Sequence, residues 1–333
     1  MKRFNGVYVQ DSSTIALPAE LADRFPGSGG AASTAAVKVQ TRLNLLTGGL
    51  DYVDLEPGRN PDQGSAMQQA SLPAGALRLA DLGFFSVATL ALLARQSVYW
   101  ISRIQSATAV FSTAGERLEL HRWLPTHVTC GVVEMSIELG SRERLPCRLF
   151  AFRVPDEVAA RRRQRLHEDT RRKGRSPSQQ RLQWCQWTVY VTNVEPERLT
   201  AQEILVLYRA RWQIELLFKL WKSHGLLGTT TRSQPVHQAV EVFARLLAVT
   251  VQHWLLVAGV WQFADRSLVK AARIVRGFVP SLAMALHYPD LLIKQLATMR
   301  ASLAKTARIN PRKRKPNTYQ LLLKPELLDY ALT

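Results

Sequence analysis

Five side chains that could bind a metal ion or phosphate recur along residues 208–222 at helical spacing. At about 100° per residue, a helix would gather them in one stripe roughly 80° wide. They are Tyr208, Arg211, Glu215, Lys219 and Lys222. A carboxylate flanked by cations suits a metal-bound phosphate, because the carboxylate holds the ion while the cations hold phosphate oxygens. Helix salt bridges between residues four apart are the structural alternative.

The helix that would carry this stripe is predicted over residues 201–224, with Thr200 as its cap. Most of its remaining surface is apolar: Leu205, Leu207, Ile214, Leu216, Leu217, Phe218, Leu220 and Trp221. A surface helix normally shows a narrow apolar stripe and a wide polar face. The reversed pattern predicts a nearly buried helix that exposes one polar line.

The composition indicates a globular protein that binds a polyanion. The 333 residues include 44 Lys plus Arg against 26 Asp plus Glu, which gives a net charge of +18. Nucleic acid is the first partner to consider, and an anionic membrane surface the second. Residues 246–263 are apolar but include Gln252 and His253, so we expect a buried helix and no membrane span. The odd number of cysteines, three, argues against a disulfide scaffold and for a reducing compartment.

The first hundred residues have the order of an α/β core. A strand over residues 6–10 ends at Asp11, and a hairpin over 36–55 turns at Gly48. A buried strand over 76–85 carries Asp81, a helix over 86–95 begins at Ser86, and a strand follows at 97–104. Strand, acid, helix and strand in succession predict an α/β fold.

The middle of the chain looks like an insertion rich in β structure. Strands are predicted at residues 117–124, 148–154 and 184–193, and a basic helix at 157–174. Helices are then predicted at 238–263 and 267–275, before a basic tail at 308–315. We therefore expect four regions: 1–104, first part of the core; 105–183, β-rich insertion with the basic helix; 184–230, last part of the core with the Glu helix; 231–333, helical C-terminal region.

The spacing Tyr-x2-Arg-x3-Glu-x6-Lys, here Tyr208 to Lys222, resembles the signature of the insertion-sequence 4 (IS4) family of DDE transposases. Two further blocks resemble that family in the right order: DSSTIALPAELADRFPGSGGAA from Asp11 and LADLGFFSVATL around Asp81. The resemblance covers roughly residues 5–260. It implies a ribonuclease-H-like fold, with the first acid on the first strand and the Glu on a helix after a β-rich insertion.

The resemblance also implies a two-metal phosphoryl transfer. Asp11, Asp81 and Glu215 would hold two Mg²⁺ ions, with Mn²⁺ able to substitute, and the enzyme would cut transposon ends and join the 3′-OH to target DNA. The structural alternatives are a turn or cap role for Asp11, a helix cap near Ser86 for Asp81 and a salt bridge for Glu215. Rival first acids lack the matching block: Asp51, Asp54 and Asp62.

DNA contacts are expected from the same helix and from the insertion. Arg211, Lys219 and Lys222 would grip phosphates, and Tyr208 would pack on the backbone or donate its hydroxyl. In members of the family that cut through a DNA hairpin, a Trp of the insertion stacks on a flipped base, and we expect Trp187 in preference to Trp184 and Trp123. Core packing is the alternative for Tyr208 and Trp187. The basic runs at 161–175 and 308–315 would bind phosphates without sequence preference.

Only ten residues precede Asp11, whereas family members usually carry a helical DNA-binding region before the first catalytic strand. We therefore expect this chain to lack that region. Two other functions stay open: a non-catalytic DNA-binding remnant or transposition inhibitor, and a metal-dependent nuclease of the same fold. Expected partners are the terminal inverted repeats, target DNA and a second copy on paired ends, in a bacterial cytoplasm at the nucleoid, with no membrane.

Overall fold

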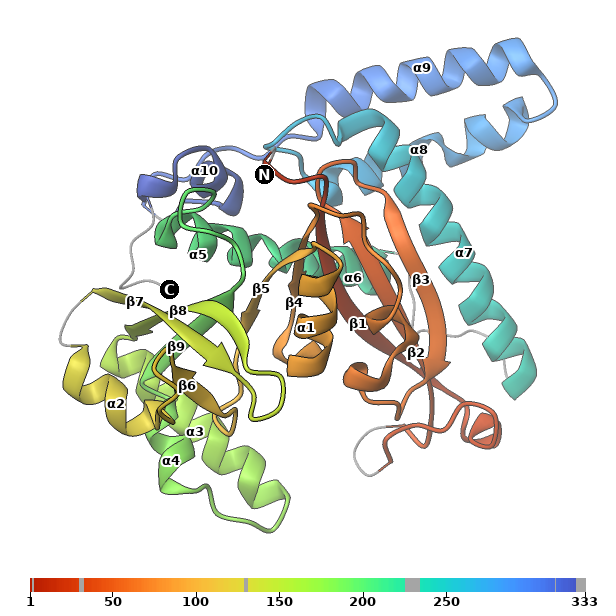
Figure 1. The fold of residues 1–333 in the computed structure, drawn as a ribbon. Coiled ribbons are helices and arrows are strands. Elements are labelled where there is room, and N and C mark those ends of the chain that lie inside the picture. Colours follow the sequence, from red (N-terminus) through yellow and green to blue (C-terminus); the bar gives the residue numbers. More distant parts are fainter. Residues whose placement is uncertain (2, 30–32, 129–130, 225–233, 315, 328–333) are drawn as a thin grey trace. The chain divides into compact units, whose positions relative to one another are not determined.

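The computed structural model describes residues 1, 3–29, 33–128, 131–224, 234–314 and 316–327 (Figure 1). These form two compact units, each assembled from separate stretches of chain. Unit 1 comprises Met1–Val7, Gln68–Ala210 and Gln320–Thr333. Unit 2 comprises Tyr8–Met67 and Arg211–Tyr319. Of the three cysteines, Cys147 and Cys185 are free thiols, and Cys130 lies outside the described residues.

Unit 2 is built on an antiparallel meander of three strands: β1 (Val7–Leu17), β2 (Ala35–Asn44) and β3 (Leu50–Pro57). The predicted hairpin is confirmed, and Gly48 turns it with a φ of 80°. The prediction that the first strand ends at Asp11 is wrong. β1 continues to Leu17 because its backbone stays paired with β2, and Asp11 lies opposite Thr41 within that ladder.

The helices of unit 2 are α6 (Trp212–His224), α7 (Pro235–Val260), α8 (Leu268–Ala285) and α9 (Pro289–Thr306). The two predicted C-terminal helices are confirmed as α7 and α8, and α9 follows as the antiparallel partner of α8 (Figure 1). α7 fixes the hairpin turn: the His253 Nε2 lies 2.7 Å from the Gly48 carbonyl, and the Trp261 indole donates to the Leu45 carbonyl at 3.0 Å.

Among the described helices, α7 is the one whose length and apolar composition would suffice to cross a membrane. A buried helix was expected here, and α7 is buried along one side. Residues on that side are buried, among them Val242, Leu246, Val249 and His253, whereas Leu247 and Trp254 are exposed. The pattern is that of a helix packed along one face.

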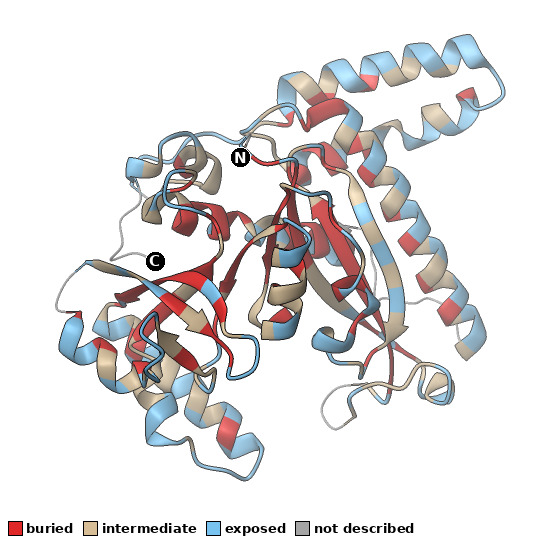
Figure 2. Cartoon of the chain, viewed as in Figure 1, coloured by how far each residue is buried: buried red, intermediate tan, exposed pale blue. Residues whose placement is uncertain are grey.

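Unit 1 holds a sheet in the order β4-β5-β9-β8-β7-β6. Its strands are β4 (Leu77–Ala80), β5 (Tyr99–Arg103), β6 (Val110–Ser112), β7 (Val132–Leu139), β8 (Leu145–Arg153) and β9 (Trp187–Thr192). β4 and β5 are parallel and are joined by α1 (Val87–Arg95), whose cap is Ser86 as predicted. Figure 2 shows that β4, β5, β8 and β9 of this sheet are mostly buried.

The predicted insertion contains more helix than its sequence pattern indicates. It carries α2 (Leu120–His127), α3 (Asp156–Arg172) and α4 (Gln179–Trp184), and its strands β6 to β8 extend the sheet of unit 1. The strand predicted over 117–124 is wrong. Leu120 and Leu124 are both buried, and Trp123 stacks on His127 at 4.1 Å, so the four-residue spacing of a helix prevails.

The predicted helix over 201–224 is two helices, α5 (Ala201–Ala210) and α6, with a turn at Arg211. Thr200 does cap α5: its hydroxyl accepts from the Glu203 amide at 3.3 Å. The boundary between the units falls at the same turn. Apolar residues of α5 pack in unit 1 and those of α6 in unit 2, so packing overrides the continuous helical pattern. The short α10 (Thr318–Leu323) adds Leu321 to the α5 core.

Candidate active site

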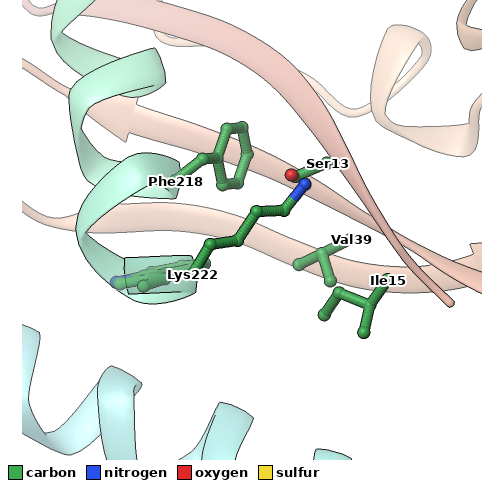
Figure 3. Close-up of a pocket in the computed structure, with 6 residues that line it drawn as sticks. Ser13, Ile15, Val39, Phe218 and Lys222 are labelled. Carbon is green, nitrogen blue, oxygen red and sulfur yellow. The ribbon is translucent and has the colours of Figure 1, made fainter. Parts of the chain in front are cut away.

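The first predicted acid lies on the face of β1 that α6 covers. Alternate residues of β1 share a face, so Asp11, Ser13 and Ile15 point to the same side. Phe218 and Trp221 of α6 line a small pocket there together with Ile15 and with Val39 of β2, and Figure 3 labels Phe218, Ile15 and Val39. α6 therefore lies over the face of β1 that carries Asp11.

Arg211 joins two of the predicted acids within unit 2. Its Nη2 lies 2.8 Å from the Glu215 Oε1, and its Nη1 lies 3.7 Å from the Asp11 Oδ2. The three side chains are 13–25% exposed, so the cluster is partly shielded from water. Two carboxylates drawn toward one guanidinium are relieved of their mutual repulsion. The structure therefore contains the salt bridge that is the structural alternative for Glu215, and Arg211 of that salt bridge also lies near Asp11.

Lys222 lies in a small pocket at the other end of the same helix face. Ser13, Ile15 and Val39 line it from the sheet, and Phe218 and Trp221 from α6. Figure 3 shows the Lys222 ammonium directed toward the Ser13 hydroxyl. Burial lowers the pKa of Lys222 from its ordinary value, because the apolar walls disfavour the charged form. No motif in the sequence singles out Ser13, although Ser13 stands two residues after Asp11 on the same strand face.

Lys219 is exposed on α6. Its ammonium lies 4.6 Å from the centre of the Trp212 ring, a cation–π contact. The predicted single stripe of five residues is wrong as geometry, because the turn at Arg211 interrupts the helix. Unit 2 brings together Asp11, Arg211 and Glu215, and places Lys222 on the same face.

Asp81 belongs to unit 1, where it directly follows β4. It occupies the N-cap position of a short 3-10 helix (Leu82–Phe84) without a capping side-chain hydrogen bond, and Ser86 caps α1 instead. The cap alternative for Asp81 therefore finds no support. Tyr208 is close by: its hydroxyl donates to the Ala80 carbonyl at 3.2 Å.

Tyr208 and Trp187, predicted to touch DNA, are both core residues of unit 1. Tyr208 is 6% exposed and packs on Tyr190 at 4.7 Å between ring centres. Trp187 is 3% exposed, and Arg162 donates to its carbonyl at 3.0 Å. Both side chains are therefore packed in the core, which is the structural alternative to DNA contact. Trp184 is half-buried on α4, outside β9, since the predicted strand begins only at Trp187.

The rival first acids all have local partners in unit 2. Asp51 pairs with Arg42, and Asp54 accepts from the Tyr52 hydroxyl at 3.2 Å. Asp62 accepts from Ser12 at 2.8 Å, Lys38 at 3.1 Å and Gln40 at 3.3 Å. These contacts tie the sheet to its neighbouring loop and give the rivals a structural role.

Carboxylate oxygens are the ligands that Mg²⁺ prefers, and Asp11 with Glu215 supplies two such groups on one side of unit 2. In the part of the chain that the structure describes, no three His, Cys, Asp or Glu side chains are grouped closely enough to hold a metal ion. The donor types fit a magnesium site, and Arg211 already holds the two carboxylates toward a common positive charge.

The basic segments divide into anchored and exposed side chains. On α3, Arg162 bonds to β9 through the Trp187 carbonyl and the Thr188 hydroxyl, whereas Arg161 and Arg165 are exposed. In the tail, Arg308 pairs with Asp265 at 2.6 Å. Lys315 lies outside the described residues. Phosphate binding by the remaining exposed arginines and lysines of these segments stays a prediction.

Comparison with known proteins gives one family model and a set of relatives. The family model is described as "Transposase DDE domain" and matches residues 2–251. The transposase for insertion sequence element IS1151 of Clostridium perfringens is 27% identical over 284 residues, covering 80% of this chain and 59% of that protein. The transposase for insertion sequence element IS231E of Bacillus thuringiensis subsp. finitimus is 28% identical, covering 74% of this chain and 55% of that protein.

A shorter stretch is similar to a third protein. The putative transposase InsL for insertion sequence element IS186A of Escherichia coli (strain K12) is 35% identical over 103 residues, which are 31% of this chain. The chain spans between 55% and 59% of the length of the first two relatives.

Proposed function

Because this chain belongs to the transposase DDE domain family, we propose that it is a DNA transposase of an insertion sequence, with Asp11, Asp81 and Glu215 as its three metal-binding acids. The membership bears out the resemblance drawn from the motifs. The proposal adds the chemistry: cleavage at the ends of the element and joining of the 3′-OH to target DNA. A ribonuclease-H-like arrangement of the core is part of the same proposal.

The observation that carries the proposal is the convergence of Asp11 and Glu215 on Arg211, at 3.7 and 2.8 Å. The two acids are some two hundred positions apart in the sequence, yet the packing of α6 on β1 sets them around one positive charge. An arginine can serve two acids in a purely structural cluster, so the pairing alone does not decide the function. Two partly buried acids that are close enough to share one cation could also share a divalent ion, whose preferred ligands are carboxylate oxygens.

When bound, two Mg²⁺ ions would supply activation of the attacking oxygen and stabilisation of the leaving oxygen. The protein's own side chains have the remaining tasks. Lys222, which lines the small pocket together with Ser13, would present its ammonium to a phosphate near the acids. Exposed Lys219 adds an outer phosphate contact. Tyr208 acts by positioning, because its hydroxyl holds the carbonyl of Ala80 directly before Asp81.

The partners follow from the same proposal. The terminal repeats and the target would be DNA, drawn by the net charge of +18. Pairing of two ends would need a second copy of the chain. The site would work in a bacterial cytoplasm, where DNA and Mg²⁺ are both at hand.

The test is cleavage of a supercoiled plasmid that carries the ends of the element, with and without Mg²⁺. Wild type is compared with Glu215→Gln and with Glu20→Gln, which removes an exposed acid from the same unit. We expect Mg²⁺-dependent nicks and joined products from wild type and Glu20→Gln, and neither from Glu215→Gln. Nicks without joined products would support the nuclease alternative, and DNA binding without cleavage would support the non-catalytic one.

A further inference from the structure

Arg211 occupies the position where a cation is needed. Its guanidinium reaches Glu215 with one terminal nitrogen and Asp11 with the other, at 2.8 and 3.7 Å. Its side chain is 13% exposed, less than either acid, at 18% for Asp11 and 25% for Glu215. The positive charge is therefore more shielded from water than either of these two acids.

A guanidinium and a divalent ion cannot both be closest to the same carboxylates. Arginine stays protonated in proteins, so it cannot give way by losing a proton. Like charges a few ångströms apart in a partly buried site repel strongly. Binding of a divalent ion by Asp11 and Glu215 therefore has to displace Arg211 from at least one of them.

A displaced Arg211 needs a new anion. The planar fork of donors that fits a carboxylate also fits a phosphate. The same helix carries Lys219 and Lys222, so a DNA backbone attracted to α6 would bring phosphates within reach. DNA thus supplies the partner that Arg211 needs when a metal ion takes its place.

We propose that Arg211 is an exchangeable counter-ion, which holds Asp11 and Glu215 together in the free protein and moves to a DNA phosphate when a divalent ion binds. This rests on the proposed function of the two acids. Metal ion and DNA then strengthen each other's binding, because the metal ion releases Arg211 to bind a DNA phosphate and DNA draws Arg211 away from the metal-binding acids; such coupling is reciprocal. The site would load its metal ions chiefly when DNA is present, which limits reactions without substrate.

The experiment measures Mn²⁺ binding to the full chain by electron paramagnetic resonance, with and without a random-sequence DNA duplex. Arg211→Gln is compared with wild type and with Lys294→Gln, which removes the same charge from an exposed position of α9 in the same unit. Without DNA, we expect Arg211→Gln to bind Mn²⁺ at least about 5-fold more tightly than wild type, the lower end of typical coupling. Lys294→Gln should differ little from wild type. The duplex should tighten Mn²⁺ binding to wild type more than to Arg211→Gln.

Two results would overturn the proposal. The first is Mn²⁺ affinity of Arg211→Gln equal to that of wild type or of Lys294→Gln. The second is an equal effect of the duplex on wild type and Arg211→Gln. Should Arg211→Gln fail to fold, Arg211→Lys keeps the test: one ammonium cannot span both acids, so its Mn²⁺ affinity should exceed that of wild type by a smaller factor, and equality counts against the proposal.

The double variant Asp11→Asn/Glu215→Gln separates this inference from the proposed function. Loss of Mn²⁺ binding in the double variant, together with no effect of Arg211, would reject the exchange and leave the acids as metal ligands. Undiminished Mn²⁺ binding in the double variant would reject both.

Discussion

On one face of β1, Asp11 and Ser13 lie beneath α6; on the other, Ser12 faces a polar network centred on Asp62. Both faces are rich in hydroxyls, acids and cations. On the Asp62 face one acid accepts from three donors, Ser12, Lys38 and Gln40. On the α6 face the numbers of donor and acceptor side chains are reversed: one donor, Arg211, pairs with two acids, Asp11 and Glu215.

The difference indicates how a structural acid differs from a candidate metal ligand on the same strand. Several donors fix the Asp62 carboxylate, and removing it would leave a lysine buried without its counter-charge. Asp11 and Glu215 share Arg211, a cation that a divalent ion could replace.

The largest expected effect is on the α6 face. Asp11→Asn should lower Mg²⁺-dependent cleavage by about 10³-fold or more, since a metal ion contributes several kcal/mol to phosphoryl transfer and each 1.4 kcal/mol is about tenfold. Stability should change little, because the amide still occupies the space. Cleavage rate and urea midpoint are measured together. Near-normal cleavage by Asp11→Asn would remove Asp11 from the site.

The next effect is on the opposite face. Asp62→Ala should lower the free energy of unfolding by about 2–3 kcal/mol, because Lys38, only 9% exposed, loses its carboxylate. Cleavage per folded molecule should persist. Urea denaturation measures the change, and Asp54→Ala, whose partners are the Tyr52 hydroxyl and a backbone amide, is the control expected to stay within about 1 kcal/mol. Equal losses for the two variants would contradict the comparison.

A third effect concerns the hairpin that carries both faces. Burial lowers the pKa of His253 below its ordinary value of 6.5. The unfolded chain then takes up a proton at a higher pH than the folded one, so stability falls as pH drops from 6.5 toward the lower folded pKa. The slope reaches at most about 1.4 kcal/mol per pH unit. Urea midpoints across this range measure it. His253→Gln should flatten the dependence, and His287→Gln, at an exposed histidine, should keep it.

The smallest effect comes from two neighbouring serines on opposite faces. Ser12→Ala should cost about 1 kcal/mol of stability, because its hydroxyl bonds to Asp62 at 2.8 Å, and should spare cleavage. Ser13→Ala should leave stability within about 0.5 kcal/mol and reduce cleavage by about tenfold or less, because the Lys222 ammonium loses the hydroxyl it faces. Unfolding and cleavage assays on both variants test the pair, and identical profiles would erase the distinction between the faces.

Local patterns predicted several elements correctly for identifiable reasons. The Gly48 turn, the Ser86 cap and the Thr200 cap are each set by one residue and its neighbours, so sequence reasoning finds them. The prediction that the first strand ends at Asp11 was wrong, because no single residue and its neighbours decide where that strand ends. Asp, Ser and Thr are turn residues in isolation, but pairing with β2 supplies their backbone partners to Leu17.

The candidate site was predictable in its residue types and only partly in its geometry. The spacing from Arg211 to Lys222 identified the acid and its cations. It could not show that the helix breaks at Arg211, nor that Tyr208 packs in a different unit, because a helical pattern does not reveal which core each half will join. Trp187 was misassigned for a similar reason: a strand aromatic gives no sign of its exposure until its neighbours are placed.

The sequence by itself determined the family and the net positive charge, because motifs and composition depend on residue identity alone. Only the tertiary structure decided that Arg211 lies between Asp11 and Glu215, that Ser13 faces Lys222, and that Asp62 is a structural acid. Those relations join residues distant in the chain. The first two follow from the packing of α6 on β1, and the contacts of Asp62 follow from the pairing of β1 with β2 beneath the segment after β3; no local spacing encodes either.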